Sequence, residues 1–162
     1  MKAGLFILFI VILTAAALID SRTMEIPDRF PAMILVLALL AAAVRMRTAE
    51  GSQLPLSSRI LGFFAVSVPM LLLTAAVPGA FGGGDIKLTA ACGAFLGWKL
   101  VLLAAFFAVL GGGCYGIWLL AAKKVSRKEH FAFGPFLCAG MVIACFWGEA
   151  ILKWYLTAAF GL

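Results

Sequence analysis

Charged side chains are scarce in this sequence. Lys, Arg, Asp and Glu make up 12% of its 162 residues, whereas 65% of the residues are hydrophobic and the mean hydropathy is +1.14. Soluble globular domains carry about 25% charged residues, so the composition excludes that class and indicates a membrane protein with several spanning segments. We expect one membrane-embedded domain over residues 1–162.

Metal-binding and disulfide patterns are lacking as well. The chain has one histidine and four cysteines, and no two cysteines form a Cys-x-x-Cys pair. Structural zinc sites need closely spaced Cys and His ligands. The sequence therefore predicts no metal site and no cofactor. It predicts free thiols buried inside apolar segments at Cys92, Cys114, Cys138 and Cys145.

The net charge of +6 is not gathered on a nucleic-acid-binding face. Most of the thirteen basic residues stand in short connectors between apolar segments. This distribution favours membrane topology and contact with anionic lipid headgroups, and it argues against nucleic acid as a partner. The most basic connector runs from Lys123 to His130, and such a loop is usually cytoplasmic.

Long uncharged runs predict an all-α polytopic fold with about six transmembrane helices. The first run resembles a signal peptide, but several apolar runs follow it, so we interpret it as a retained span. A helix needs about 20 residues to cross a bilayer, and residues 88–98 fall well short before Lys99. That segment is either a short span or re-entrant. The predicted spans are 3–19, 30–44, 60–77, 88–98, 100–122 and one within 131–162.

The stretch from Gly82 to Lys87, Gly-Gly-Gly-Asp-Ile-Lys, places an acid at a membrane boundary. An ionisable residue in such a position indicates a functional site, because a charge that is not compensated there is costly. The three glycines allow another chain to approach the backbone closely. The alternative is an ordinary turn with an acid at the start of the next helix, where Asp is favoured.

Asp20 ends the first predicted span and Asp85 begins the fourth. Two complete spans lie between them, so both carboxylates face the same side of the membrane. Two neighbouring carboxylates can share one proton, so that one activates water as a base while the other acts as an acid. The sequence thus predicts an aspartic dyad. The alternative is that the two acids pair independently with Arg22 and Lys87.

Three short motifs resemble those of the type IV prepilin peptidases. The segment from Asp20 to Asp28, with Ile26-Pro27 near its end, is similar to the D-x5-I-P-N segment that carries the family's first catalytic aspartate. The segment from Gly82 to Leu88 is similar to the GGGD-x-K-L segment that carries the second. Phe133-Gly134-Pro135-Phe136-Leu137 resembles the FGPFL element that opens the last helix of the family.

This resemblance implies a membrane aspartic endopeptidase of the bacterial plasma membrane. Family members remove a short, positively charged leader from pilin and pseudopilin precursors at the cytoplasmic face, with pilus or secretion assembly machinery as possible further partners. Positive charge alone leaves the orientation nearly even, with seven basic residues on one side and six on the other. The implied catalytic residues are Asp20 and Asp85, and the implied site-shaping residues are Gly82, Gly83, Gly84, Pro27 and Lys87.

The sequence departs from the family pattern at two positions and in one region. Asp28 stands where the family usually has Asn, which adds a third acid near the site, and Ala132 stands where Pro often occurs. Many members also carry a cysteine-tetrad region before the first aspartate and methylate the new N-terminus. Nineteen residues precede Asp20 here and no Cys-x-x-Cys pair occurs, so we expect no methyltransferase activity.

Two other kinds of function use the same acids. In a small ion-coupled transporter, Asp20 and Asp85 would relay protons or bind cations. In a structural subunit of a secretion apparatus, both acids would be inactive. Cleavage of a prepilin separates the peptidase from both alternatives.

Overall fold

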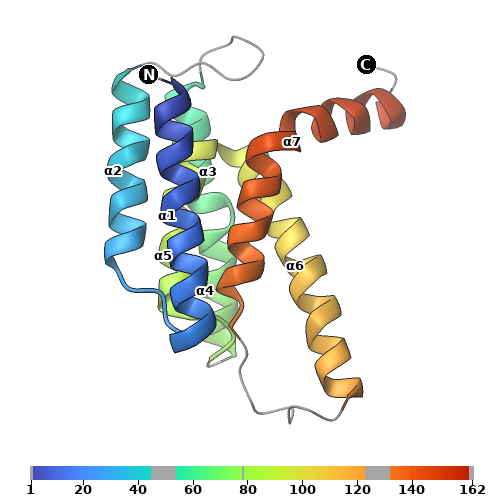
Figure 1. The fold of residues 1–162 in the computed structure, drawn as a ribbon. Helices are drawn as coiled ribbons and strands as arrows, with labels where there is room; N and C mark the ends of the chain where they lie inside the picture. Colours follow the sequence, from blue (N-terminus) through green and yellow to red (C-terminus); the bar gives the residue numbers. More distant parts are fainter. Residues whose placement is uncertain (1, 45–53, 78, 123–131, 161–162) are drawn as a thin grey trace.

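The computed structural model describes residues 2–44, 54–77, 79–122 and 132–160 (Figure 1). These ranges are helical and contain no strand, which confirms the predicted all-α fold. The connector at 45–53 and the basic segment from Lys123 to His130 lie outside the described residues. The helices are α1 (Lys2–Thr23), α2 (Arg29–Ala43), α3 (Leu56–Ala65), α4 (Ser67–Ala76), α5 (Gly83–Leu96), α6 (Trp98–Ala121) and α7 (Gly134–Phe160).

Every one of the six predicted spans falls on a helix, and four stretches of the described chain are long and apolar enough to cross a membrane. They are Gly4–Thr23, Leu56–Ala76, Trp98–Leu119 and Gly134–Ala158, where the second combines α3 and α4. Helix α2 is apolar but has only 15 residues, and α5 has only 14. At about 1.5 Å per residue, α5 is about 21 Å long, shorter than a hydrocarbon core of about 30 Å.

The short fourth segment has different boundaries from those predicted. Helix α5 begins at Gly83, not at residue 88, and it ends at Leu96 because Gly97 takes a left-handed conformation with φ of 86°. A Cβ at Gly97 would also come within 2.8 Å of Ser58 Oγ. Lys99 therefore belongs to the first turn of α6 and does not end the fourth segment.

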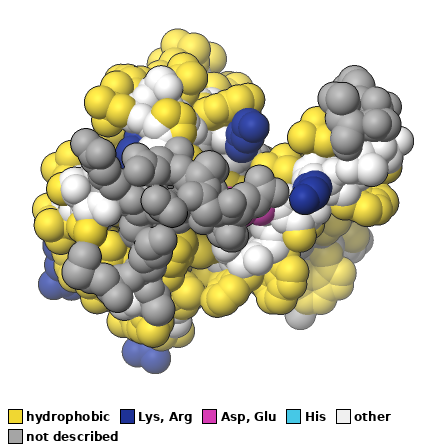
Figure 2. Space-filling model, turned by 90° about the horizontal axis from the view of Figure 1, so that it is seen from above, with side chains coloured by type: hydrophobic (Ala, Val, Ile, Leu, Met, Phe, Trp, Pro, Cys, Tyr) yellow, Lys and Arg dark blue, Asp and Glu magenta, His cyan; other side chains and the backbone are white. Residues whose placement is uncertain are grey.

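Large hydrophobic side chains cover much of the outside of the helix bundle, as a membrane-embedded protein requires. Figure 2 shows them around the molecule as seen from above, with few Lys or Arg side chains among them. Examples from different helices are Ile7, Leu39, Leu72, Ile117 and Trp154, with exposed fractions between 62% and 71%.

The four cysteines are free thiols, as the sequence predicts, but they are not all buried. Cys92 and Cys138 are buried and Cys145 is half-buried, whereas Cys114 is exposed. The prediction of burial is wrong for Cys114 because position in an apolar helix does not say which face of that helix the residue occupies.

Helix α5 lies inside the bundle, in contact with α2, α3, α4, α6 and α7. Its crossing with α3 is tight, because a Cβ on Gly93 would overlap the backbone carbonyl of Gly62. The buried Arg59 guanidinium, from α3, donates to the carbonyl of Ala38 in α2 at 3.4 Å and to that of Ala94 in α5 at 3.1 Å. These contacts hold the C-terminal half of α5 in the bundle, while its other end carries Asp85.

Candidate active site

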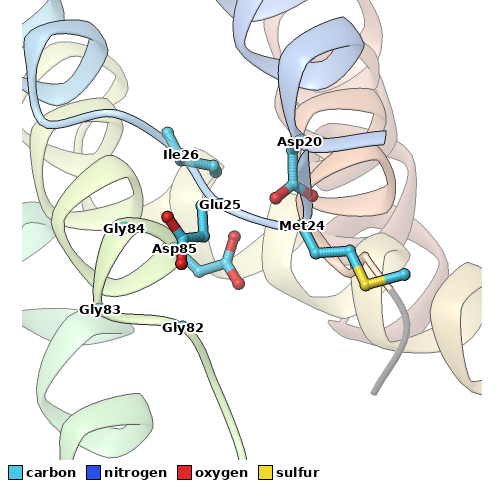
Figure 3. Close-up of a pocket in the computed structure, with 8 residues that line it drawn as sticks. All are labelled: Asp20, Met24, Glu25, Ile26, Gly82, Gly83, Gly84 and Asp85. Atoms are coloured by element: carbon cyan, nitrogen blue, oxygen red, sulfur yellow. The ribbon is translucent and has the colours of Figure 1, made fainter. Parts of the chain in front are cut away.

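A cavity of about 360 Å³ opens where α1 ends and α5 begins, at the lower end of the molecule in Figure 1. It brings together the two predicted catalytic acids and the three glycines, which the sequence separates by more than fifty residues. Figure 3 shows the side chains of Asp20, Glu25 and Asp85 in this cavity. Its lining consists of Asp20, Met24, Glu25, Ile26, Gly82, Gly83, Gly84 and Asp85.

Asp85 stands in the first turn of α5 and is only 8% exposed. Gly82 is the N-cap residue of this helix, so Asp85 occupies the third helical position. From there its carboxylate reaches back to the Gly82 backbone N–H and accepts a hydrogen bond, which is one half of a capping box. The partial positive charge at the helix N-terminus also favours an acid here. Local helix chemistry thus orients the Asp85 side chain.

Asp20 stands in the last turn of α1 and is 3% exposed. Its carboxylate lies against Gly134, the first residue of α7, whose backbone N–H is its hydrogen-bond donor. The FGPFL segment therefore opens the last helix, as the resemblance implies, and it does so directly at Asp20. Each acid is consequently placed at a helix N-terminus, Asp85 at that of its own helix and Asp20 at that of α7.

The electrostatics of the cavity favour a shared proton. Asp85 lies in α5, which is not among the four stretches long enough to cross a membrane. Burial, and after it the charge of Asp20, raise the pKa of Asp85 to about 6, against the opposing effect of the hydrogen bond from Gly82. The influence of Asp20 shows that the two carboxylates interact. Neighbouring carboxylates resist simultaneous ionisation, so they titrate as a pair.

One oxygen of each acid is buried without a hydrogen-bond partner in the described part of the chain. These atoms are Asp20 Oδ2 and Asp85 Oδ1. Buried polar atoms in folded proteins nearly always have partners, so two unpartnered oxygens on acids that line one cavity need an explanation. They are available to hold a proton, a water molecule or a polar group of a substrate, as general acid–base chemistry requires.

The alternative pairing of the acids with basic neighbours is wrong. Lys87 Nζ instead donates to both carboxylate oxygens of Asp28, at 2.7 and 2.8 Å, and both side chains are exposed. Within the described ranges, Asp20 and Asp85 form no ion pair with Arg22 or Lys87. Within those ranges, the two acids therefore have no basic partner that would neutralise their charge.

Two of the implied site-shaping residues lie away from the cavity lining. Lys87 points to the opposite side of α5, where it lines an apolar groove with Asp28. Pro27 lies in the turn before α2, and its carbonyl accepts a hydrogen bond from the Phe30 N–H at 3.1 Å. Asp28, the expected third acid, is the N-cap residue of α2 and does not line the cavity either.

The third acid of the cavity is Glu25, which the sequence does not single out. Met24 takes a left-handed conformation with φ of 55°, which turns the chain after α1 and directs Glu25 into the cavity. A non-glycine residue in this conformation is uncommon, and such residues gather at functional sites. The only available signal in the sequence is that Glu25 lies between Asp20 and the Ile26-Pro27 pair.

The described residues contain no group of three His, Cys, Asp or Glu side chains that could hold a metal ion. The ionisable side chains that line the cavity are those of Asp20, Asp85 and the exposed Glu25.

Comparison with known proteins adds a family match. The type IV leader peptidase family matches residues 7–117, a range that contains both acids. Three relatives carry the name prepilin leader peptidase/N-methyltransferase. The chain is 33% identical to the one from Bacillus subtilis, covering 96% of this chain and 60% of the relative. It is 31% identical to the one from Legionella pneumophila, over 93% and 52%. It is 29% identical to the one from Pseudomonas aeruginosa, over 98% and 54%.

The chain thus spans between half and three fifths of the length of these relatives. No solved structure gives a significant match.

Proposed function

This chain belongs to the type IV leader peptidase family, and we propose that it is a membrane aspartic endopeptidase that removes the leader from pilin-like precursors. Asp20 and Asp85 form its catalytic dyad. The observation that carries the proposal is that Asp20 and Asp85 line one cavity, and that each has a buried carboxylate oxygen, Asp20 Oδ2 and Asp85 Oδ1, without a hydrogen-bond partner in the described chain. The names of the relatives supply the class of substrate.

The reaction needs one proton on the pair. The ionised carboxylate removes a proton from a water molecule as the water oxygen attacks the carbonyl carbon of the scissile bond. The protonated carboxyl donates its proton to the carbonyl oxygen, which gives a neutral tetrahedral diol. The diol then collapses: the leaving nitrogen takes a proton from the pair, the C–N bond breaks, and a hydroxyl proton returns to the pair. The dyad ends with one proton, as it began.

The glycines provide room for an extended substrate backbone beside the dyad. Gly83 has no atom within 4 Å of the position where a Cβ would stand, so its backbone is open to the cavity. Extended peptides are commonly bound through main-chain hydrogen bonds, which an open backbone can make. The whole domain, residues 1–162, serves to hold this site at the edge of the membrane.

We place the chain in the bacterial plasma membrane with the site on the cytoplasmic side. Arg22, Arg29 and Lys87 lie near the end of the bundle that carries the cavity, but positive charge alone leaves the two sides nearly even, so the orientation rests on the resemblance to the family. The placement is tested with a Ser21→Cys variant in which Cys114 is replaced by Ser. A membrane-impermeant thiol reagent should label it only after the cells are opened; labelling of intact cells would contradict the orientation.

The substrate in this proposal is a prepilin or pseudopilin, and pilus or secretion machinery is a possible further partner. The relatives' names also include N-methyltransferase activity. The absence of that activity from this chain stays a prediction, which methyl transfer to a cleaved pilin would contradict.

The dyad is tested by replacing each acid with its amide. Asp20→Asn and Asp85→Asn in detergent-purified protein should each lower prepilin cleavage by about 10³-fold or more. In each variant one carboxyl group is left, and it cannot act as general base and general acid at the same time. Asp28→Asn is the matched control and should cleave normally. Retained cleavage by either dyad variant would rule out the mechanism. Proton or cation flux in proteoliposomes without any cleavage would favour the transporter instead.

A further inference from the structure

Glu25 is a third carboxylate at the candidate active site, and the dyad mechanism does not use it. Its side chain is exposed and projects into the cavity that Asp20 and Asp85 line (Figure 3). Within the described part of the chain it forms no ion pair. Asp28 stands only three residues later and is bound to Lys87 at 2.7 Å. Of the two acids in this turn, only Glu25 keeps its charge available for a ligand.

The backbone of Glu25 is held in place. The Thr23 hydroxyl lies 3.0 Å from the Glu25 carbonyl oxygen, and the Glu25 N–H donates to the same hydroxyl at 3.4 Å. Between them, Met24 takes its left-handed conformation. The next residue, Ile26, is buried. The side chain of Glu25 therefore starts from a fixed point at the rim of the cavity.

The cavity attracts positive charge. Its lining contains three carboxylates, and the other lining residues are glycines, Met24 and Ile26. No Lys or Arg is among them. Two of the carboxylates, those of Asp20 and Asp85, are more than nine-tenths buried, and each has one oxygen without a hydrogen-bond partner in the described chain. A concave site lined by charge of one sign concentrates ligands of the opposite sign.

We propose that Glu25 determines specificity by binding a cationic side chain of the substrate, Lys or Arg, close to the scissile bond. This inference rests on the proposed peptidase function. The dyad must keep one proton for catalysis, so the exposed Glu25 is the acid that remains free to form an ion pair. Because its carboxylate acts on binding and not on the reacting atoms, its loss raises KM and leaves kcat nearly unchanged.

The test compares two peptides of one prepilin sequence. One carries a Lys two residues before the scissile bond on the leader side, and the other carries Gln there. The wild-type chain in detergent should cleave the Lys peptide about fivefold more efficiently by kcat/KM, as expected for one partly exposed ion pair. The preference should shrink at high salt, because salt screens exposed charges. Glu25→Gln should remove the preference, and Asp28→Asn should keep it.

A charge swap separates recognition from a general structural effect. Glu25→Lys should cleave a third peptide, with Glu at the same position, better than the Lys peptide. A variant that is merely misfolded loses activity on all three peptides alike. If wild-type protein cleaves the peptides without preference, or if the preference survives Glu25→Gln, the inference is overturned. If wild-type protein cleaves no prepilin peptide, the proposed function itself fails, and the inference fails with it.

Discussion

The carboxylate of Asp20 packs against Gly134 so closely that a Cβ at Gly134 would overlap it. The first turn of α7 thus packs on the Asp20 side chain, and Ile26 Cδ1 lies 3.1 Å from the same Cβ position. Glycine at position 134 is required by the space that the Asp20 side chain occupies. This gives a physical reason for the glycine in the Phe133-Gly134-Pro135 motif.

Gly134→Ala should therefore displace the Asp20 carboxylate and lower prepilin cleavage strongly. A shift of about 1 Å in a reacting group costs about 100-fold in rate, and the added methyl group requires a shift of that order. The measurement is kcat for prepilin cleavage by the purified variant, with its thermal unfolding recorded in parallel.

Gly113→Ala is the matched control for this substitution. Gly113 lies in α6 and has no atom within 4 Å of its Cβ position. This variant should keep wild-type activity. If Gly134→Ala cleaves prepilin at the wild-type rate, Asp20 does not need its present position and the dyad geometry is wrong.

The raised pKa of Asp85 predicts how activity depends on pH. Burial and the charge of Asp20 raise this pKa to about 6, so above that pH the proton shared by the pair is lost. The mechanism needs that proton, and kcat/KM for a prepilin peptide should fall with an apparent pKa near 6 for the free enzyme. A rate that stays constant from pH 5 to about 8 would contradict a one-proton dyad.

The same shift predicts a change in stability. Because the pKa of Asp85 is higher in the folded chain than its usual 3.8, ionisation opposes folding. The penalty is absent well below pH 3.8 and complete above about pH 6. Asp85→Asn removes it and should stabilise the fold at pH 8, by on the order of 2 kcal/mol, but not at pH 4. Thermal unfolding in detergent at the two pH values measures the difference.

The common location of Asp20 and Asp85 was predictable because it depends only on whether the number of spans between them is even. Errors in the ends of each span do not change that count. The start of α7 at Gly134 agrees with the resemblance of Phe133-Gly134-Pro135 to an element that opens the last helix of the family, whereas the fourth span was predicted to begin at residue 88 and α5 begins at Gly83. The packing of Gly134 on Asp20 joins distant parts of the chain, and no local pattern reveals it.

The choice between Glu25 and Asp28 as the third acid was not predictable from the sequence. The two acids stand three residues apart, and their surroundings in the sequence are similar. The left-handed conformation of Met24 and the start of α2 at Arg29 decide which one enters the cavity. For the same reason, Lys87 was expected near Asp85, although the helical turn directs it to Asp28. The end of α5 depends on the conformation of Gly97.

For the adjacent glycines Gly83 and Gly84 in the first turn of α5, the same substitution is predicted to have different outcomes. A Cβ at Gly84 would lie 2.6 Å from the carbonyl oxygen of Ile26, whereas one at Gly83 would meet nothing within 4 Å. Gly84→Ala should push the Ile26 segment away and cost about 1 to 3 kcal/mol, which lowers the melting temperature by about 2 to 10 °C. Gly83→Ala should leave it nearly unchanged. Helix propensity affects both variants alike, so the difference between their melting temperatures isolates the contact with Ile26. Equal melting temperatures would show that the segment does not pack on Gly84.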